Sequence, residues 1–277
     1  MIEALQFEFM RNALLAGLLT SIICGVIGTL IVVNRIVFLS GGIAHTAYGG
    51  IGISFFFGLP FLAGTIGFTL LAAMVMAAVT LKARHRSDTI IGVLWAVGMA
   101  VGVILMDLKP GYNVDLMSYL FGSILTVSSS SLWQMLAMGI GIVLVTGYFY
   151  QDFIAMSYDE EFARLRGIPV TFLYFLLIGM TAISIVIIIR VVGLILVIAL
   201  LTIPPFIAEK HSKSLAQMML LSSALSTAFT LTGLWLSYRF DLTSGATIIL
   251  VAGTGFLTSL LIERLMVIRA ESNLPRP

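Results

Sequence analysis

Long stretches of this chain carry no charged side chain, and this limits what it can fold into. No Asp, Glu, Lys or Arg occurs within residues 36–81, 116–151 or 167–189. A helix needs about 20 apolar residues to cross the roughly 30 Å hydrocarbon core of a membrane, so each stretch can hold one or two crossings. Only 10% of the 277 residues are charged, against about a quarter in ordinary soluble domains. We therefore expect a polytopic membrane protein and exclude a soluble enzyme.

The apolar segments predict an all-α fold with nine membrane-spanning helices. Helices are expected because lipid offers no partner to unpaired backbone groups, and the segments lack the alternation of a membrane barrel. The predicted spans are Asn12–Val33, Ile36–Leu59, Phe61–Leu81, Thr89–Met106, Leu132–Tyr150, Thr171–Ile189, Val191–Ile207, Leu215–Leu236 and Ala246–Ile262. Val191–Ile207 is short, and Pro204-Pro205 should end or kink it. The count falls to eight if this segment does not cross.

The basic residues predict the orientation, because Lys and Arg accumulate on the cytoplasmic side. With the N-terminus outside, the four basic residues on the outer side are Arg11, Lys109, Arg190 and Arg239. The other eleven of the fifteen then lie inside. This bias predicts an N-out, C-in chain and agrees with an odd number of spans.

Two connections between the spans are long enough to carry structure of their own. Asp107–Ser131 lies outside and contains an apolar segment, Met117–Ser128, which suits a short interfacial or re-entrant helix. Gln151–Val170 lies inside, and its centre, Tyr158–Arg166, has acids early and arginines late, as the helix dipole favours. No tandem repeat or soluble domain is evident, so residues 1–277 are expected to form a single transmembrane domain.

Familiar catalytic motifs are absent from the sequence. There is no G-x-x-x-x-G-K-[ST] phosphate loop, so ATP would have to be bound by another polypeptide if it drives this protein. A net charge of +2 with scattered basic residues does not suggest a nucleic-acid partner. The single cysteine, Cys24, excludes a disulfide within the chain and a zinc site built from cysteines.

His45 is the best candidate for a functional residue, because polar side chains inside spans are costly and default to functional hypotheses. Glycines at positions 41, 42, 49 and 50 surround it. They either let helices approach closely, with the histidine hydrogen-bonded to a neighbour, or leave room for an ion. Imidazole is a good ligand for zinc and related metals, but one histidine is not a complete site. His85 and His211 lie in basic connections and are expected to be solvated.

Three stretches resemble the permease subunits of ATP-binding-cassette importers for zinc, manganese or iron(II). The first is Val33-Asn34-Arg35 with the Ser40–Gly52 run, which is similar to the family's arginine followed by Gly-Asp-x-x-Ser-His-Ala. The second is Tyr119–Leu125. The third runs from Tyr158 to Ala208 and includes the segment Val192–Pro205. Gly233–Tyr238 and Ser244-Gly245 fit as well, so the resemblance covers nearly the whole chain.

The resemblance implies a type II importer-like permease in a prokaryotic cell membrane, crossing it several times. Two copies would pair as a homodimer, two ATP-binding subunits would dock inside, and an extracytoplasmic metal-binding protein would deliver the ion. The chain itself would not be an enzyme and would hold no permanent cofactor; Zn²⁺, or Mn²⁺ or Fe²⁺, would be its cargo. The segment 151–170 would couple it to the ATPase. The coupling residues are Asp159, Glu160, Glu161, Ala163 and Gly167.

The translocation path would be lined by His45 with Gly41, Ser40 and Tyr48. The family's pattern places an aspartate one helical turn before the histidine, and here that position is Gly41. We expect this loss to make the site less negative and to favour zinc over manganese, because manganese prefers carboxylate ligands.

Other classes of protein fit the sequence less well. A permease for a metal chelate has less need of a histidine at the membrane midplane. A secondary transporter driven by an ion gradient normally needs intramembrane carboxylates, and no acidic residue falls inside a predicted span. A membrane enzyme would need acids and histidines clustered at one depth.

Overall fold

Helices form nearly the whole chain. The computed structural model describes residues 6–82, 86–109, 120–122 and 124–272, and none of these lies in a β-strand. The helices are α1 (Glu8–Val33), α2 (Val37–Phe57), α3 (Phe61–Lys82), α4 (Ser87–Asp107), η2 (Ile124–Thr126), α6 (Ser129–Tyr148), α7 (Tyr150–Tyr158), α8 (Glu160–Leu165), α9 (Val170–Val192), α10 (Leu194–Glu209), α11 (Leu215–Phe240) and α12 (Ser244–Ser272). Each of the nine predicted spans corresponds to one helix of at least 16 residues, which confirms the all-α, polytopic fold class.

Seven of these helices are long and apolar enough to cross a membrane, namely α1, α3, α4, α6, α9, α11 and α12. The other two predicted spans are α2 and α10. Helix α2 has 21 residues, but its glycines and His45 lower its hydrophobicity. Helix α10 is apolar and has 16 residues, so it is about 24 Å long and shorter than the hydrocarbon core.

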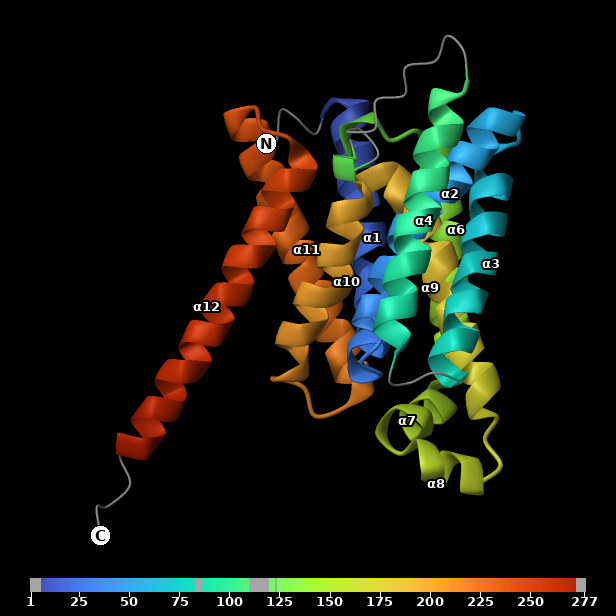
Figure 1. The fold of residues 1–277 in the computed structure, drawn as a ribbon. Helices are drawn as coiled ribbons and strands as arrows, with labels where there is room; N and C mark the ends of the chain where they lie inside the picture. Colours follow the sequence, from blue (N-terminus) through green and yellow to red (C-terminus); the bar gives the residue numbers. More distant parts are fainter. Residues whose placement is uncertain (1–5, 83–85, 110–119, 123, 273–277) are drawn as a thin grey trace.

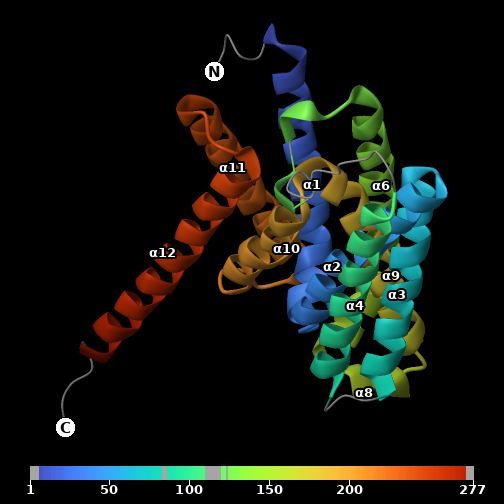
Figure 2. The ribbon, with the colours of Figure 1, turned by 45° about the horizontal axis from the view of Figure 1, so that its top comes forward.

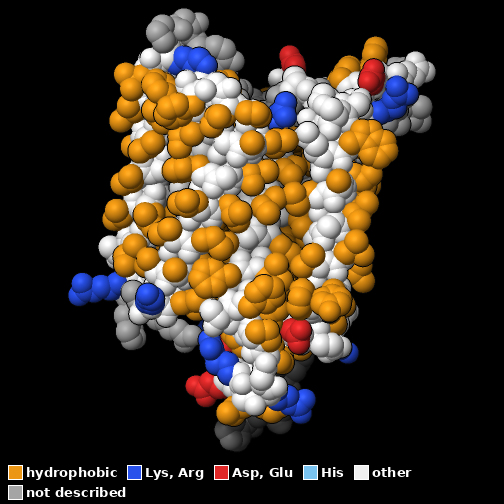
Figure 3. Space-filling model, turned by 90° about the vertical axis from the view of Figure 1, so that its right-hand side faces the viewer, with side chains coloured by type: hydrophobic (Ala, Val, Ile, Leu, Met, Phe, Trp, Pro, Cys, Tyr) orange, Lys and Arg blue, Asp and Glu red, His pale blue; other side chains and the backbone are white. Residues whose placement is uncertain are grey.

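Charged side chains gather at the two ends of the bundle, with an apolar belt between them on the face seen in Figure 3. The start of α1 and the end of α12 lie at opposite ends (Figure 1), as an odd number of crossings requires. Helices α7 and α8, the α1–α2 turn and the α10–α11 turn share the end at which α12 finishes. The basic residues predicted to face the cytoplasm in these segments therefore belong to one side.

Helices α1 and α9 form the centre of the bundle, and about two thirds or more of each apolar window is buried. Helices α2, α3 and α4 pack together on one side of them, and α10, α11 and α12 on the other (Figures 1 and 2). Helix α12 contacts α10 and α11 and then leans away from the bundle toward its C-terminal end.

The segment before α6 lies against the α9–α10 turn and the start of α12 through three glycines. A Cβ at Gly122 would lie 2.2 Å from the carbonyl carbon of Val192, and one at Gly193 would lie 2.3 Å from the backbone nitrogen of Gly122. A Cβ at Gly245 would lie 2.1 Å from the carbonyl oxygen of Phe121. The second and third stretches of the resemblance thus meet Ser244-Gly245 in one backbone junction.

The predicted interfacial helix at Met117–Ser128 falls partly outside the described residues. The part that is described contains the short 3-10 helix η2 and ends at Ser128. Ser128 is the N-cap of α6, and its hydroxyl accepts a hydrogen bond from the backbone N–H of Ser131. The serine run therefore begins the next span.

The expectation that Pro204-Pro205 would end the span at that point is wrong, because α10 continues through both prolines to Glu209. A kink at the prolines stays a prediction. Pro205 cannot donate to the carbonyl of Leu201, as a residue four positions later normally would. That carbonyl abuts Gly28 of α1, where a Cβ would lie 2.6 Å from the Leu201 oxygen. Close packing against α1 accommodates the prolines, as neighbouring helices do in membranes.

Candidate functional site

His45 lies in the middle of α2 on a half-buried face. Its Nδ1 lies 2.8 Å from the backbone oxygen of Gly41, one turn earlier. A carbonyl oxygen can only accept, so Nδ1 carries the hydrogen in this contact and Nε2 of the neutral ring carries the lone pair. Ligating histidines commonly hold their second nitrogen in this way. The neutral ring is therefore in the tautomer that suits metal binding through Nε2.

Trp95 of α4 stacks on the imidazole of His45. The ring centroids of His45 and Trp95 lie 3.9 Å apart with an angle of 28° between the planes. The ring of Phe38 is tilted by 53° from the indole plane, with its centroid 6.1 Å away. Sequence reasoning missed Trp95, because it is on another helix, fifty positions further along the chain. The signal that could have found it is the pair of glycines at 98 and 102, whose spacing is typical of a helix that packs closely against another.

The glycines around His45 divide into two kinds. A Cβ at Gly42 would lie 2.6 Å from the Ile91 side chain, and one at Gly49 would lie 2.9 Å from the backbone oxygen of Gly98. Gly50 approaches the backbone of α3 in the same way. These three glycines serve helix packing. Gly41 differs, because nothing lies within 4 Å of a Cβ built there, so the position one turn before His45 is open.

The other two predicted path residues are buried within the chain. Ser40 is 2% exposed, and its hydroxyl donates to the backbone oxygen of Val37 at 2.8 Å. Tyr48 is also 2% exposed. Of the four predicted residues, the structure therefore brings His45 and Gly41 together on a partly exposed face and places Ser40 and Tyr48 in the packing of α2.

A single copy of the chain offers few ligands for a metal. Among the residues that the structure describes, no three His, Cys, Asp or Glu side chains are close enough together to hold an ion. Cys24 is fully buried in α1. The candidate site in one chain thus consists of the His45 imidazole and the open space beside Gly41.

The predicted coupling segment forms a capped helix outside the bundle. The carboxylate of Asp159 accepts a hydrogen bond from the N–H of Phe162 at 2.9 Å, as an N-cap of α8. Glu160 and Arg164 form an ion pair at 2.8 Å on its exposed face. The predicted helix Tyr158–Arg166 is shorter in the structure, because Asp159 separates α7 from α8.

Gly167 ends α8 in the left-handed conformation, with φ of 79°. Its N–H donates to the oxygen of Arg164, and the N–H of Ile168 donates to the oxygen of Ala163, both at 3.0 Å. This pair of bonds is a Schellman motif, which favours glycine. Ala163 is fully buried, whereas Leu165 is 87% exposed. The helix thus rests on the bundle through Ala163 and presents an apolar tip. Glu161 lies on the same short helix.

A cavity of about 310 Å³ lies between α8 and the α1–α2 turn. Arg35 of the α1–α2 turn and Glu160 and Arg164 of α8 line it. In the same turn, the amide of Asn34 donates to the hydroxyl of Ser157 in α7 at 2.9 Å. The α7–α8 segment is therefore connected to the C-terminal end of α1, directly before the turn into the helix that carries His45.

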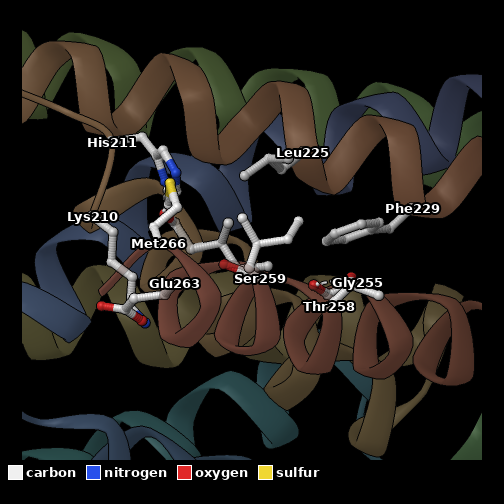
Figure 4. A pocket seen from close by; sticks show the side chains of 11 residues that line it. Lys210, His211, Leu225, Phe229, Gly255, Thr258, Ser259, Glu263 and Met266 are labelled. Atoms are coloured by element: carbon white, nitrogen blue, oxygen red, sulfur yellow. Dashed lines mark hydrogen bonds and ion pairs between the residues drawn. The ribbon is translucent and has the colours of Figure 1, made fainter. Parts of the chain in front are cut away.

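A cavity of about 470 Å³ lies between α10, α11 and α12 (Figure 4), and none of its lining residues comes from α2. Its walls are mainly apolar, with Leu225 and Phe229 among them, and one end carries His211 and the ion pair of Lys210 with Glu263. His211 is exposed, and its ring contacts the backbone oxygen of Ile207. This agrees with the expectation of a solvated histidine. His85 lies outside the described residues.

The sequence profile of the ABC 3 transport family matches residues 6–263. The chain belongs to this family. The uncharacterized membrane protein slr2045 of Synechocystis is 49% identical over 95% of this chain and 94% of its own length. The manganese import system permease protein ScaB of Streptococcus gordonii is 32% identical over 93% and 92%. The structure of PsaBC from Streptococcus pneumoniae in complex with Fab matches with a TM-score of 0.85 at 32% identity, covering 93% of each chain.

These findings confirm the resemblance found in the sequence. As a member of the ABC 3 transport family, the chain is the permease, or membrane subunit, of a metal-type ATP-binding-cassette importer. It is a multi-pass protein of a prokaryotic cell membrane.

Proposed function

We propose that this ABC 3 permease carries a divalent transition-metal ion, with His45 as a ligand in the path. The observation that carries the proposal is the half-buried imidazole of His45, whose Nδ1 is held by Gly41 and which lies one turn after the open position at Gly41. A transport site must bind the ion strongly enough to admit it and weakly enough to release it. One imidazole completed by water or by a second copy of the chain meets that need.

In this proposal the whole chain, residues 1–277, acts as one domain and pairs with a second copy. Two ATP-binding subunits dock on the segment 151–170, and an extracytoplasmic protein delivers the ion. The exposed apolar side chain of Leu165 outside the membrane, beside buried Ala163, supports a docking role for α8. The connection of Asn34 to Ser157 offers a mechanical link from that docking site to the turn between α1 and α2.

Zinc is the cargo that the site chemistry favours. Imidazole suits zinc, whereas manganese prefers carboxylates and water, and Gly41 removes the family's carboxylate. Manganese is the second candidate, because the related permease of Streptococcus gordonii is named for manganese import. The two candidates share the same path and differ in the ligands that complete it.

Metal uptake by proteoliposomes that contain the permease and its ATPase tests the proposal. His45→Ala should abolish uptake of radioactive zinc while assembly with the ATPase persists. His45→Gln should also fail, because an amide does not replace the Nε2 ligand. His211→Ala, in the exposed turn after α10, is the matched control and should transport normally. Wild-type uptake by both His45 variants would remove His45 from the mechanism, and faster uptake of manganese than of zinc by the unaltered chain would favour the second candidate.

A further inference from the structure

Resting on the proposed role of His45, we infer that Trp95 is a positioning residue for the transported metal ion, and that its indole senses the binding of that ion. The indole stacks on the imidazole at 3.9 Å and 28°, close enough for direct contact between the two rings. Trp95 comes from α4 and is half-buried. Its ring therefore covers one face of the proposed ligand without being sealed in the core.

Two contacts together fix the orientation of the His45 ring. The bond between Nδ1 and the Gly41 oxygen sets which nitrogen faces the ion. Rotation of an imidazole about its second side-chain torsion is otherwise broad, so one hydrogen bond leaves the ring plane poorly defined. The stacked indole supplies the second constraint. Nε2 is then held in one direction before the ion arrives, which reduces the entropy lost on binding.

The indole also favours the metal-bound form of the imidazole. A bound divalent cation draws electron density from the ring, and the electron-rich face of tryptophan attracts positive charge better than tyrosine or phenylalanine does. Such contacts correspond to a change in affinity of about 3- to 30-fold. In this chain the family's carboxylate is replaced by Gly41, so the Trp95 stack compensates for part of the lost attraction.

A purely structural role for Trp95 would have different consequences. The tilted ring of Phe38 in α2 has its centroid 6.1 Å from that of the indole, and a residue that only filled the interface between α2 and α4 would make the same contact. Loss of packing would lower the amount or the stability of assembled complex. It would not change the metal concentration at half-maximal uptake by the complex that remains.

Uptake kinetics with zinc and with manganese separate the two roles. We expect Trp95→Leu to raise KM about tenfold with the maximal rate per assembled complex within about twofold of the unaltered chain, and Trp95→Phe to recover part of the loss. Trp133→Leu is the control, because Trp133 of α6 is 70% exposed. An unchanged KM in Trp95→Leu, in a complex whose His45→Ala variant is inactive, would overturn this inference and leave the proposed function standing. Full activity of His45→Ala would overturn both.

Fluorescence gives a readout that does not depend on transport. In a chain with Trp133→Phe and Trp235→Phe, Trp95 is the single tryptophan. Titration of the assembled complex in nanodiscs with Zn²⁺ or Mn²⁺ should change its emission saturably, and His45→Gln should remove the change. This experiment also decides the matter if Trp95→Leu does not assemble. Trp95 fluorescence that does not change on addition of metal, at concentrations that support uptake, would overturn the inference.

Discussion

The glycines of α2 show how the same residue type can have opposite tolerance to substitution. A Cβ at Gly52 would lie 2.4 Å from the backbone oxygen of Gly102, whereas nothing lies near a Cβ at Gly41. We expect Gly52→Ala to lower the free energy of unfolding by about 1–3 kcal/mol, since backbone cannot move away cheaply. Gly41→Ala should leave stability within about 0.5 kcal/mol. Thermal unfolding of the two detergent-purified variants checks the contrast, and equal melting temperatures would contradict it.

Open space at Gly41 also allows the family's aspartate to be restored. Gly41→Asp should fold, because its Cβ meets no neighbour, and should add a carboxylate one turn from His45. A carboxylate favours the harder ion. We expect the ratio of manganese to zinc uptake to rise about tenfold, measured by competition in proteoliposomes. Gly41→Asn, which has the same size without the charge, is the control; an equal shift in both variants would show that charge is not the cause.

Residue spacing predicted that His45 was the residue to examine, but not its surroundings. The glycines at 41, 42, 49 and 50 are equivalent in the sequence, and only the neighbouring helices distinguish the open one from the packed ones. The contact of Trp95 with His45 depends on how α4 lies against α2. No periodicity within either helix carries that information.

At the scale of single elements, α8 depends on its C-terminal glycine. Gly167 has φ of 79°, and nothing lies near a Cβ built there. The left-handed backbone conformation at position 167 therefore limits which residues can replace the glycine, and the space available for a side chain within the chain does not. Gly167→Val should destabilise the end of α8 by about 1–2 kcal/mol, whereas Gly167→Asn, which tolerates this conformation, should cost less. In vesicles with the ATPase, the valine variant should hydrolyse ATP with uptake reduced several-fold. Normal uptake by Gly167→Val would contradict the coupling role.

The positions of helices were predicted well where charged residues bound a span. They were predicted less well where packing against other helices determines whether a helix continues. Pro204-Pro205 predicted an end or a kink in α10, but the helix does not end there, because Gly28 of α1 lets its backbone approach closely. Helix α7 was predicted only as part of a connection, since its composition is mixed. The three-glycine junction could not be predicted, because its members, Gly122, Gly193 and Gly245, lie in segments that meet only after the bundle has formed.

For the whole molecule, the first expectation to test is that this chain forms the membrane path and a separate subunit hydrolyses ATP. The sequence holds no phosphate loop, so the isolated chain should hydrolyse no ATP above the background of an empty-membrane preparation. A separate ATP-binding subunit should copurify with it and supply the activity. The amount of copurified subunit should fall at least several-fold in Leu165→Glu, which places a charge on the exposed apolar tip of α8. Robust hydrolysis by the contaminant-free chain would contradict this division.

Orientation in the membrane is the property of the whole molecule that the fold alone does not determine, because a bundle can be inserted either way up. The excess of basic residues at the end that carries α7, α8 and the α10–α11 turn predicts that this end is cytoplasmic.

The single native cysteine, Cys24, is fully buried, so Cys24→Ser gives a background without a reactive thiol in which the orientation can be tested. In that background, Arg239→Cys at the end of α11 should react with a membrane-impermeant maleimide in intact cells. Lys213→Cys in the α10–α11 turn should react only after the membrane is opened. The two positions are both exposed and lie at opposite ends of α11, so each controls for the reactivity of the other, and the reverse labelling pattern would show an N-in, C-out chain.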